Sequence, residues 1–371
     1  MSGRSVPGVR VVFAGGGSGG HLAPALAVSE RLADADPAGA TLFLCSERAI
    51  DAEMLSAHDV RFEALPSQPW SRSPGAAWRF LRGQGTAVRT AIGHLKRFDP
   101  HVVVAVGGFA SVAGVLAAAR LGVRRVLYNL DVLPGRANRL VRPLCSEVVS
   151  SVTVSHRRGF DRVIGPPIRR EALPPAAPGQ CRRQLGLDPE RPTLLVTGAS
   201  QGSASLNRLM VEWLAQDSAG FAGWQVLHLT GGGDPEPARE SYRQAGVAAR
   251  VEAFAHPMGL AWGAASLAIT RAGANSVAEV HAAAVPAVLV PYPHHRDRHQ
   301  WLNAAPLVAL GGAVVVEDRI DPRANMASIA AAARRLMGDH PRRAAMSRAL
   351  REHPPSDGAS VLANELLRLR R

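Results

Sequence analysis

Short runs of aliphatic and β-branched residues alternate with alanine-rich, amphipathic stretches along almost the whole chain, and this alternation limits the possible fold more than any other feature. Strands separated by helical stretches favour parallel sheets with crossover helices. The runs expected to form strands are Val9–Ala14, Thr41–Cys45, Val102–Val106, Arg125–Asn129, Glu147–Val152, Thr193–Thr197, Gln225–Leu229, Leu267–Thr270, Ala287–Val290 and Ala313–Val316. We therefore predict an α/β fold built on doubly wound parallel sheets.

The alternation is interrupted at Gly165–Gly179, where five prolines accumulate. Irregular, proline-rich sequence is typical of a domain boundary, and 371 residues suit two domains of ordinary size. We expect an N-terminal domain over residues 1–165, a second domain over 166–350 and a C-terminal helix over 351–371 that packs back on the first domain. Doubly wound folds bind ligands at the carboxyl ends of their strands, so the expected site is a cleft between the domains.

One uncharged segment, Val102–Ala119, is long enough to suggest a membrane span. Gly107 and Gly108 interrupt it, its first part is β-branched and its second part is rich in alanine. The segment is therefore predicted to be a buried strand, a glycine turn and a helix. The hydrophobic run Val9–Ala14 is too short for a secretory signal.

Cysteine content and net charge limit the cellular compartment and the binding partners that we expect for the protein. Three cysteines lie far apart without a CxxC pair, which favours reduced thiols in the cytoplasm over a disulfide scaffold or a zinc site. The net charge of +13 indicates anionic partners such as nucleic acid, nucleotide phosphates or acidic lipid. An arginine-, alanine- and glycine-rich composition can also reflect genomic base content, so the charge alone leaves both interpretations open.

A first glycine-rich turn, Gly15–Gly20, follows the first strand and opens a helix at His21. Glycines let backbone N–H groups approach a phosphate, and a helix N-terminus favours negative charge. The turn matches GxGxxG, and Glu47 after the second strand could bind a ribose as in a dinucleotide fold, so a dehydrogenase competes at this point. His21 is placed to face the crevice, although a histidine that only caps the helix would look the same.

A second turn, Ser200-Gln201-Gly202, follows the first strand of the second half and begins a helix that carries Asn207. Free N–H groups at this helix start could hold a phosphate or a carboxylate. The alternative is that Ser200 is a plain N-cap.

A third turn combines small residues with an acid: Gly273, Ala274 and Asn275 precede a helix expected to start near Ser276, and Glu279 falls on its first turn. The turn suits a diphosphate, and the carboxylate suits two vicinal hydroxyls such as those of a ribose. A carboxylate near a helix N-terminus is also favoured by the helix dipole, which is the structural alternative.

Two further segments carry polar or amphipathic signals. His299 and Gln300 open another helix and suit sugar hydroxyls, although any solvated helix start could look the same. Trp70–Phe98 mixes Trp78, Phe80 and Leu81 with arginines, which favours an anionic lipid surface. An ordinary helix that buries these aromatics in the core is the alternative.

Taken in order, these motifs resemble the MurG family, the UDP-N-acetylglucosamine:lipid-linked muramyl-pentapeptide N-acetylglucosaminyltransferases of bacterial peptidoglycan synthesis. The resemblance runs from about Val11 to about Val316 and rests on GGGSGGHLAPALA, GGFAS, PGRAN, GPPIR, GASQGSASLN, TRAGANSVAE and DRHQWLNA. It implies a GT-B glycosyltransferase, with two Rossmann-like domains, that transfers GlcNAc with inversion and without a metal or a cofactor.

The resemblance also implies roles for individual residues. Ser18, Gly19, Gly20 and His21 would line the acceptor side and the face of the donor sugar, with His21 as the base. Arg169 and Ser200 would contact the nucleotide and phosphates, and Arg169 would stabilise the leaving group. The other expected substrate-binding residues are Gln201, Gly202 and Asn207 at the second turn, Gly273, Ala274, Asn275 and Ser276 for the diphosphate, Glu279 for the ribose, His299 and Gln300 for GlcNAc, and the backbone at Ala255 for uracil.

Three departures from the family pattern stand out. Tyr128-Asn129-Leu130-Asp131 replaces the usual His-Glu-Gln-Asn, so the glutamate is lost and Asp131 becomes the candidate acceptor-binding residue. Phe109 replaces a usual tyrosine, and Ala272 a usual serine. Most of the changes fall on the acceptor side, so the donor site is expected to be the more intact of the two.

The sequence therefore predicts a metal-independent transferase that acts on UDP-GlcNAc and an undecaprenyl-linked muramyl-peptide. It is expected to bind anionic lipid peripherally at the cytoplasmic face of the membrane, and no nucleic acid. The alternatives left open are a related glycosyltransferase with another lipid acceptor such as diacylglycerol, a non-catalytic sugar-nucleotide binding protein, and an NAD-dependent dehydrogenase.

Overall fold

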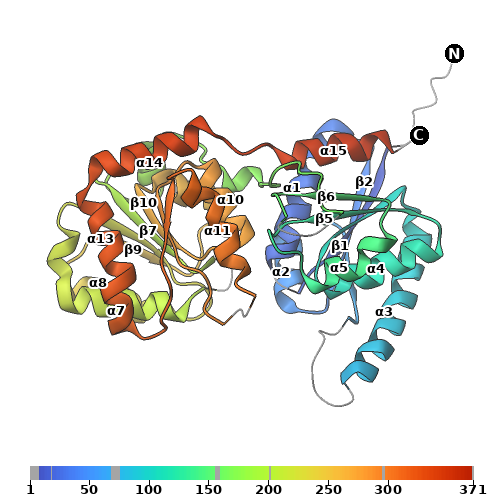
Figure 1. The fold of residues 1–371 in the computed structure, drawn as a ribbon, viewed down its shortest axis with the longest axis horizontal. Helices are drawn as coiled ribbons and strands as arrows, with labels where there is room; N and C mark the ends of the chain where they lie inside the picture. The colour runs from blue at the N-terminus through green and yellow to red at the C-terminus, as the bar shows by residue number, and fades with distance from the viewer. Residues whose placement is uncertain are drawn as a thin grey trace. The chain divides into compact units, whose positions relative to one another are not determined.

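The computed structural model describes residues 8–17, 19–67, 76–154, 159–199, 202–294 and 297–369. The chain divides into two compact units. Unit 1 comprises Met1–Arg169 and Ser356–Arg371, and unit 2 comprises Arg170–Pro355 (Figure 1).

Unit 1 is built on a six-stranded sheet in the order β3-β2-β1-β4-β5-β6, and every neighbouring pair is parallel. Its strands are β1 Arg10–Gly15, β2 Ala40–Ser46, β3 Phe62–Leu65, β4 Val102–Gly107, β5 Arg124–Asn129 and β6 Glu147–Ser150. Its helices are α1 Gly19–Ala35, α2 Ala49–Ala57, α3 Ala76–Phe98, α4 Phe109–Arg120, α5 Arg136–Val141, the 3₁₀ turn η1 Arg142–Leu144, and α15 Gly358–Arg368.

Helices cover both faces of this sheet, which is why its central strands are apolar throughout. Every residue of β4 is buried, as a parallel strand covered on both faces requires. Helix α3 instead buries one stripe, Ala87, Ala91 and Leu95, against α4 and β3 at helical spacing. The C-terminal helix α15 packs against α1, so the two ends of the chain belong to one unit.

Unit 2 repeats the same topology with the order β12-β11-β10-β7-β8-β9, again with parallel neighbours (Figure 1). Its strands are β7 Thr193–Thr197, β8 Gln225–Leu229, β9 Ala249–Glu252, β10 Leu267–Thr270, β11 Ala287–Leu289 and β12 Ala313–Val315. The helical elements are η2 Arg170–Ala172, α6 Pro178–Gln184, α7 Ala204–Asp217, η4 Ser218–Phe221, α8 Glu236–Gln244, α9 Met258–Ala264, α10 Ala274–Ala282, α11 His299–Ala309, α12 Pro322–Asn325, η5 Met326–Ala330, α13 Ala331–Gly338 and α14 His340–Glu352.

The doubly wound fold predicted from the alternation is confirmed, and each expected strand is present within two residues at either end. Two strands were not predicted, β3 and β9, and each lies at an edge of its sheet. The segment Val102–Ala119 is a strand, a glycine turn and a helix, as predicted. No helix in the described part of the chain is long and apolar enough to cross a membrane.

In both sheets the strand order reverses between the two central strands, β1 and β4 in unit 1 and β7 and β10 in unit 2. Ligands of open α/β sheets bind outside the carboxyl ends of the strands at such a reversal. The glycine turns found in the sequence follow these strands. The fold therefore places each turn where a ligand is expected.

Candidate functional site

In unit 1 the turns after β1 and β4 pack directly on each other. Gly16 and Gly108 both have positive φ angles, +134° and +78°, which L side chains rarely adopt. A Cβ atom on Gly108 would lie 1.9 Å from the Gly16 carbonyl oxygen. Only glycine fits at Gly108, because the two turns share this space.

A buried carboxylate, Asp51 on α2, holds the first turn in place. Its Oδ2 atom accepts hydrogen bonds from the Gly17 backbone N–H at 2.7 Å and the Ser46 hydroxyl at 2.6 Å. Its Oδ1 atom is buried and has no hydrogen-bond partner in the described residues. Glu47, the acid considered in the sequence for a dinucleotide ribose, is exposed, so the acid that contacts this turn is Asp51.

His21 lies on the first turn of α1, which begins at Gly19, and its side chain is half-buried. A Cβ on Gly107 would be 2.8 Å from the His21 Nδ1 atom, so the glycine makes room for the ring. Desolvation lowers the pKa of His21, although Asp131, Asp51 and a hydrogen bond to the Val106 carbonyl act in the opposite direction. The imidazole is therefore neutral at neutral pH. Ser18, which precedes this helix, lies outside the described residues.

The altered loop after β5 is held by a hydrogen-bonded amide pair. The buried Asn129 side chain donates to the Asp131 carbonyl at 2.8 Å and accepts from the Asn138 amide at 3.1 Å. The Tyr128 hydroxyl donates to the Gly165 carbonyl at 2.6 Å, which ties β5 to the segment that leaves unit 1. These replacements therefore make specific bonds within the fold, and Asp131 follows them half-buried beside His21.

Arg169, the last residue of the first segment of unit 1, contacts α2. Its guanidinium donates to the Nε2 atom of His58, the C-cap residue of this helix, at 2.7 Å. The expected phosphate-binding arginine is thus held against a neutral acceptor in this structure.

In unit 2 the first glycine turn leads into α7, which starts at Ala204, later than the sequence suggested. The N-cap is Ser203, whose hydroxyl accepts from the Leu206 N–H at 3.3 Å. The interpretation of Ser200 as N-cap is therefore wrong, because the helix begins four residues further on. Ser200 and Gln201 lie outside the described residues. Gly202 has a φ of +71°, and a Cβ there would lie 2.5 Å from the Thr230 carbonyl oxygen.

Asn207 fastens α7 to the end of β8. Its amide donates to the Thr230 carbonyl at 3.0 Å, and its carbonyl faces the His228 Nε2 atom at 3.1 Å. His228 in turn contacts the Tyr242 hydroxyl at 3.2 Å, and its burial lowers its pKa to about 4. Asn207 therefore belongs to a buried polar network beneath the turn.

A buried ion pair that was not predicted joins two of the turns. Arg271, at the end of β10, donates to the hydroxyls of Ser203 at 2.7 Å and Ser205 at 2.8 Å, and it pairs with Asp318 at 2.8 Å. Desolvation would raise the pKa of Asp318, but the Ser205, Asn325 and Ile320 hydrogen bonds and the Arg271 charge together lower it. The start of α7 is thereby fixed to the turn after β10.

Helix α10 begins at Ala274 with Gly273 as its N-cap. The first N–H groups of a helix point outward along its axis, and a helix start of this kind favours negative charge nearby. Because the helix starts two residues earlier than expected, Glu279 lies on its second turn and not its first. The dipole explanation for Glu279 is weakened by this shift, since the effect is confined to the first turn.

The remaining candidate side chains of unit 2 are Glu279 and two residues at the start of helix α11. Glu279 Oε2 accepts from the Trp262 indole N–H at 2.9 Å. Gln300 accepts from the Tyr292 N–H at 2.8 Å, and the His299 ring contacts Asp297 at 2.8 Å. These contacts place the expected sugar-binding side chains at the start of α11 (His299–Ala309).

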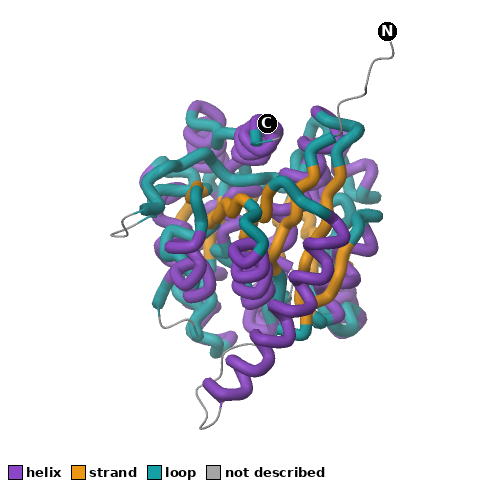
Figure 2. Tube along the Cα trace, turned by 90° about the vertical axis from the view of Figure 1, so that its right-hand side faces the viewer, coloured by secondary structure: helices purple, strands orange, loops and turns teal. Residues whose placement is uncertain are grey.

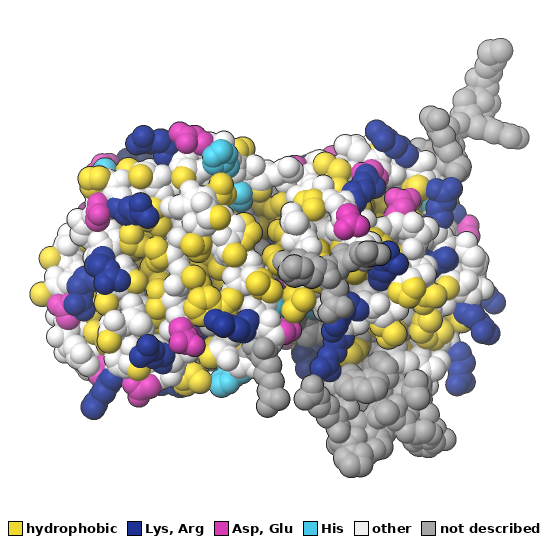
Figure 3. Space-filling model, in the orientation of Figure 1, with side chains coloured by type: hydrophobic (Ala, Val, Ile, Leu, Met, Phe, Trp, Pro, Cys, Tyr) yellow, Lys and Arg dark blue, Asp and Glu magenta, His cyan; other side chains and the backbone are white. Residues whose placement is uncertain are grey.

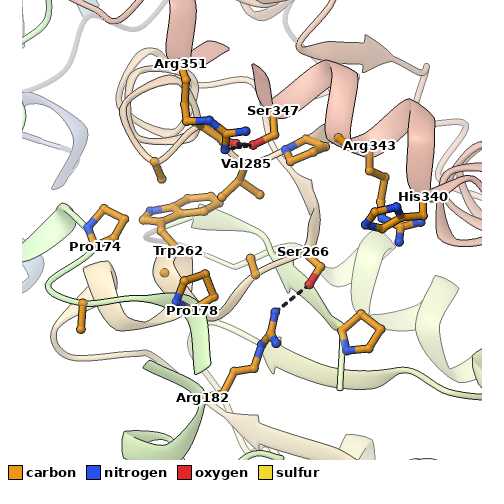
Figure 4. A pocket seen from close by; sticks show the side chains of 18 of the residues that line it. Pro174, Pro178, Arg182, Trp262, Ser266, Val285, His340, Arg343, Ser347 and Arg351 are labelled. Atoms are coloured by element: carbon orange, nitrogen blue, oxygen red, sulfur yellow. Dashed lines mark hydrogen bonds between the residues drawn. The ribbon is translucent and has the colours of Figure 1, made fainter. Parts of the chain in front are cut away.

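A separate pocket of about 540 Å³ lies at the amino ends of the unit 2 strands, near the first residues of β7, β10 and β11 (Figure 4). Arg182 already donates to the Ala264 and Pro189 carbonyls and to the Ser266 hydroxyl. Arg343 likewise donates to the Met337 carbonyl at 2.7 Å. The buried arginines of this pocket therefore serve the fold. The described residues also hold no cluster of three or more His, Cys, Asp or Glu side chains suited to a metal ion.

Comparison with protein families defines the class to which this fold and these turns belong. Residues 11–150 match the glycosyltransferase family 28 N-terminal domain, and residues 193–362 match the glycosyltransferase family 28 C-terminal domain. The protein is thus a family 28 glycosyltransferase, and the dehydrogenase alternative is excluded.

Curated relatives narrow the class further. A protein of Clavibacter sepedonicus is 35% identical over 95% of this chain and 94% of its own length, and one of a Nocardioides species is 35% identical over 97% and 98%. Both are named UDP-N-acetylglucosamine--N-acetylmuramyl-(pentapeptide) pyrophosphoryl-undecaprenol N-acetylglucosamine transferase. The chain belongs to this family of transferases, the MurG family, as its motifs indicated.

Solved structures agree on the fold. The crystal structure of Acinetobacter baumannii MurG aligns with a TM-score of 0.71 and 21% identity, over 97% of this chain and 99% of that one. The calicheamicin glycosyltransferase CalG4 aligns with a TM-score of 0.65 and 19% identity, over 98% of both chains. The predicted GT-B fold is confirmed.

Proposed function

We propose that this protein transfers GlcNAc from UDP-GlcNAc to an undecaprenyl-linked muramyl-pentapeptide, with inversion at the anomeric carbon, in peptidoglycan synthesis. Membership of the family over almost the full chain is the observation that carries the proposal. The arrangement of glycine turns, helix starts and polar side chains at the carboxyl edges of both sheets supports it.

Unit 2 is the proposed donor domain. The N–H groups at Gly273–Ser276 bind the diphosphate, together with Ser200, Gln201 and Gly202 of the first turn, and Asn207 supports that turn through its bonds to β8. Glu279 accepts the two ribose hydroxyls, and the backbone at Ala255 meets uracil. His299 and Gln300 bind the GlcNAc hydroxyls.

Unit 1 is the proposed acceptor domain. Ser18, Gly19 and Gly20 line the acceptor, with Asp131 from the altered loop beside them. In the reaction, the acceptor hydroxyl attacks the anomeric carbon and gives its proton to the neutral ring of His21. The bond from that carbon to the UDP oxygen breaks, and UDP leaves with the electron pair.

The negative charge that develops on UDP explains the proposed roles of the start of α10 and of Arg169. The leaving diphosphate gains negative charge, and preorganised donors aimed at developing charge stabilise a transition state. The start of α10 supplies such donors, and Arg169 supplies a positive charge once it leaves His58. Because these groups meet the charge, we propose that turnover needs no divalent metal and no cofactor, and that EDTA leaves the rate unchanged.

The acceptor is anchored in lipid, so the enzyme must reach the bilayer. We propose peripheral attachment to the cytoplasmic face through residues 70–98, whose first part, up to Gly75, lies outside the described residues. Helix α3 extends from the sheet of unit 1 in this region (Figures 1 and 2). Arginine near an anionic surface contributes roughly 1 kcal/mol per side chain, and salt screens that attraction.

The overall positive charge favours an anionic surface without indicating nucleic acid. Lysine and arginine side chains are spread over the visible face of both units and are not gathered into one stripe (Figure 3). Nucleic-acid binding proteins usually concentrate basic residues on one face. We propose anionic lipid as a partner and no nucleic acid.

Transfer of radiolabelled GlcNAc to a synthetic lipid-linked muramyl-pentapeptide tests the function, with diacylglycerol offered in parallel. Labelled muramyl-peptide product is expected. Transfer to diacylglycerol alone would show that the altered loop serves another lipid acceptor. UDP-GlcNAc binding without any transfer would indicate a non-catalytic binding protein.

Liposome co-sedimentation tests the attachment. Wild type should sediment with vesicles that contain anionic lipid, and less so in high salt. A Trp78→Ala, Phe80→Ala double variant should lose most of this binding, while Val361→Ala, at an exposed apolar residue of α15, should not. Equal sedimentation of the folded double variant would place the lipid contact elsewhere.

A further inference from the structure

The indole of Trp262, on helix α9, contacts Glu279, the acid proposed to bind the ribose. Its Nε1 atom lies 2.9 Å from Glu279 Oε2, and the indole itself is 1% exposed. An indole N–H can only donate a hydrogen bond, whereas a carboxylate can only accept one. The pair is therefore matched in chemistry as well as in distance.

Helix α9 is held rigidly against the preceding segment. A Cβ on Gly259 would lie 2.1 Å from the Leu173 carbonyl oxygen, and one on Gly263 would lie 2.5 Å from Cys181 Sγ. Two glycines four residues apart thus let the helix backbone approach the segment that includes Leu173 and Cys181 closely. The Trp262 ring lines the separate pocket described above, near Pro174, Pro178 and Val285 (Figure 4), while its Nε1 atom contacts Glu279.

The same helix follows the segment proposed to bind uracil. Helix α9 begins at Met258, three residues after Ala255, and Trp262 lies one turn further along. Helix α9 therefore carries the partner of the ribose acid and directly follows the uracil segment. A glutamate side chain has several rotatable bonds, and its orientation must be fixed before it can bind two hydroxyls at once.

We propose that Trp262 is a positioning residue that orients the Glu279 carboxylate and so sets the preference of the donor site for ribonucleotides. The inference rests on the proposed role of Glu279 in donor binding. Trp262 itself does not touch the donor. Its indole N–H holds Oε2, and the oriented carboxylate then accepts the ribose hydroxyls.

Calorimetric titration of UDP and 2′-deoxy-UDP tests this assignment. Wild type is expected to bind UDP more tightly, because the deoxy analogue leaves a polar group of the site unmet, an effect of roughly fivefold or more. Trp262→Phe keeps an aromatic ring and removes the N–H donor together with the rest of the five-membered ring. It should lose most of the preference and bind 2′-deoxy-UDP about as well as wild type does.

The matched control is Trp213→Phe, also in unit 2. Trp213 is fully buried, and its Nε1 atom has no hydrogen-bond partner in the described residues. This variant removes the same atoms from a core position and should keep the wild-type preference. A preference retained by Trp262→Phe would overturn the inference alone, whereas no preference in wild type would also remove Glu279 from the ribose role.

A second measurement covers the case in which Trp262→Phe does not fold. In wild type labelled with ¹⁵N-tryptophan, the indole N–H resonance that moves in Glu279→Gln identifies Trp262. UDP should shift this resonance more than 2′-deoxy-UDP does. Equal shifts with both ligands would overturn the proposal.

Discussion

The two units share one topology but stabilise their glycine turns with different chemistry. In unit 2 a buried arginine and aspartate, Arg271 and Asp318, fix the start of α7 through two serine hydroxyls. In unit 1 a lone buried carboxylate, Asp51, holds the turn through a backbone N–H and a hydroxyl. A charge-compensated frame suits the rigid binding of an anion, whereas a neutral imidazole among carboxylates suits proton transfer.

The largest effect on stability is expected at the ion pair of unit 2. Arg271→Ala leaves Asp318 buried without its counter-charge, and removing one partner of a buried pair costs about 3–5 kcal/mol. Urea unfolding measures this loss. The control Arg323→Ala, at a side chain 85% exposed, should cost less than about 0.5 kcal/mol. A loss below about 1 kcal/mol in Arg271→Ala would show that the pair does not hold the frame.

The buried network under the same turn should make stability depend on pH. The pKa of His228 is about 4 in the folded protein, below the ordinary 6.5, so the unfolded chain binds a proton that the folded one excludes. The free energy of unfolding should therefore rise with pH by about 3 kcal/mol between pH 4 and 6.5, and this contribution should be constant above pH 6.5. His228→Gln cannot titrate and should show a smaller rise in urea unfolding. An identical profile in both proteins would contradict the assignment.

A smaller effect should distinguish two glycines of unit 1 that both have a positive φ angle. Gly108 and Gly122 have φ angles of +78° and +70°, but a Cβ on Gly122 meets no described atom within 4 Å. Gly122→Ala should cost about 1 kcal/mol from backbone strain alone. Gly108→Ala should cost about 1–3 kcal/mol more, because its Cβ overlaps the Gly16 carbonyl. Equal losses in thermal unfolding would show that the two turns can separate freely.

The sequence predicted the central strands and the glycine turns because both depend on local signals. It missed β3 and β9, which have four residues each and only partial burial, so that their apolar pattern is weak. Both are edge strands, which pair with a neighbour on one side only. Fewer of their residues are therefore buried, and their sequences need not be apolar throughout.

The site was predicted unevenly for the same reason. The glycines, His21 and Glu279 were selected as candidates because they lie in turns that follow strands or on the first two turns of the helices after them. Asp318 and Trp262 could not, because each meets its partner only after the sheet has formed. Arg271 belongs to one of the sequence motifs, but nothing in the sequence indicates that its charged group is buried in the fold. Ser203 was missed because the helix start was placed too early.

The proposal that unit 2 binds the donor and that unit 1 supplies the catalytic base is tested most directly by measuring UDP-GlcNAc affinity and turnover in two variants. Glu279→Ala should weaken binding by about 1–3 kcal/mol in calorimetry, because the ribose hydroxyls lose their acceptor. His21→Ala should keep the wild-type affinity and lose turnover by a factor of about 10² to 10⁴, the usual contribution of a general base. Full turnover in His21→Ala, or unchanged affinity in Glu279→Ala, would contradict the account.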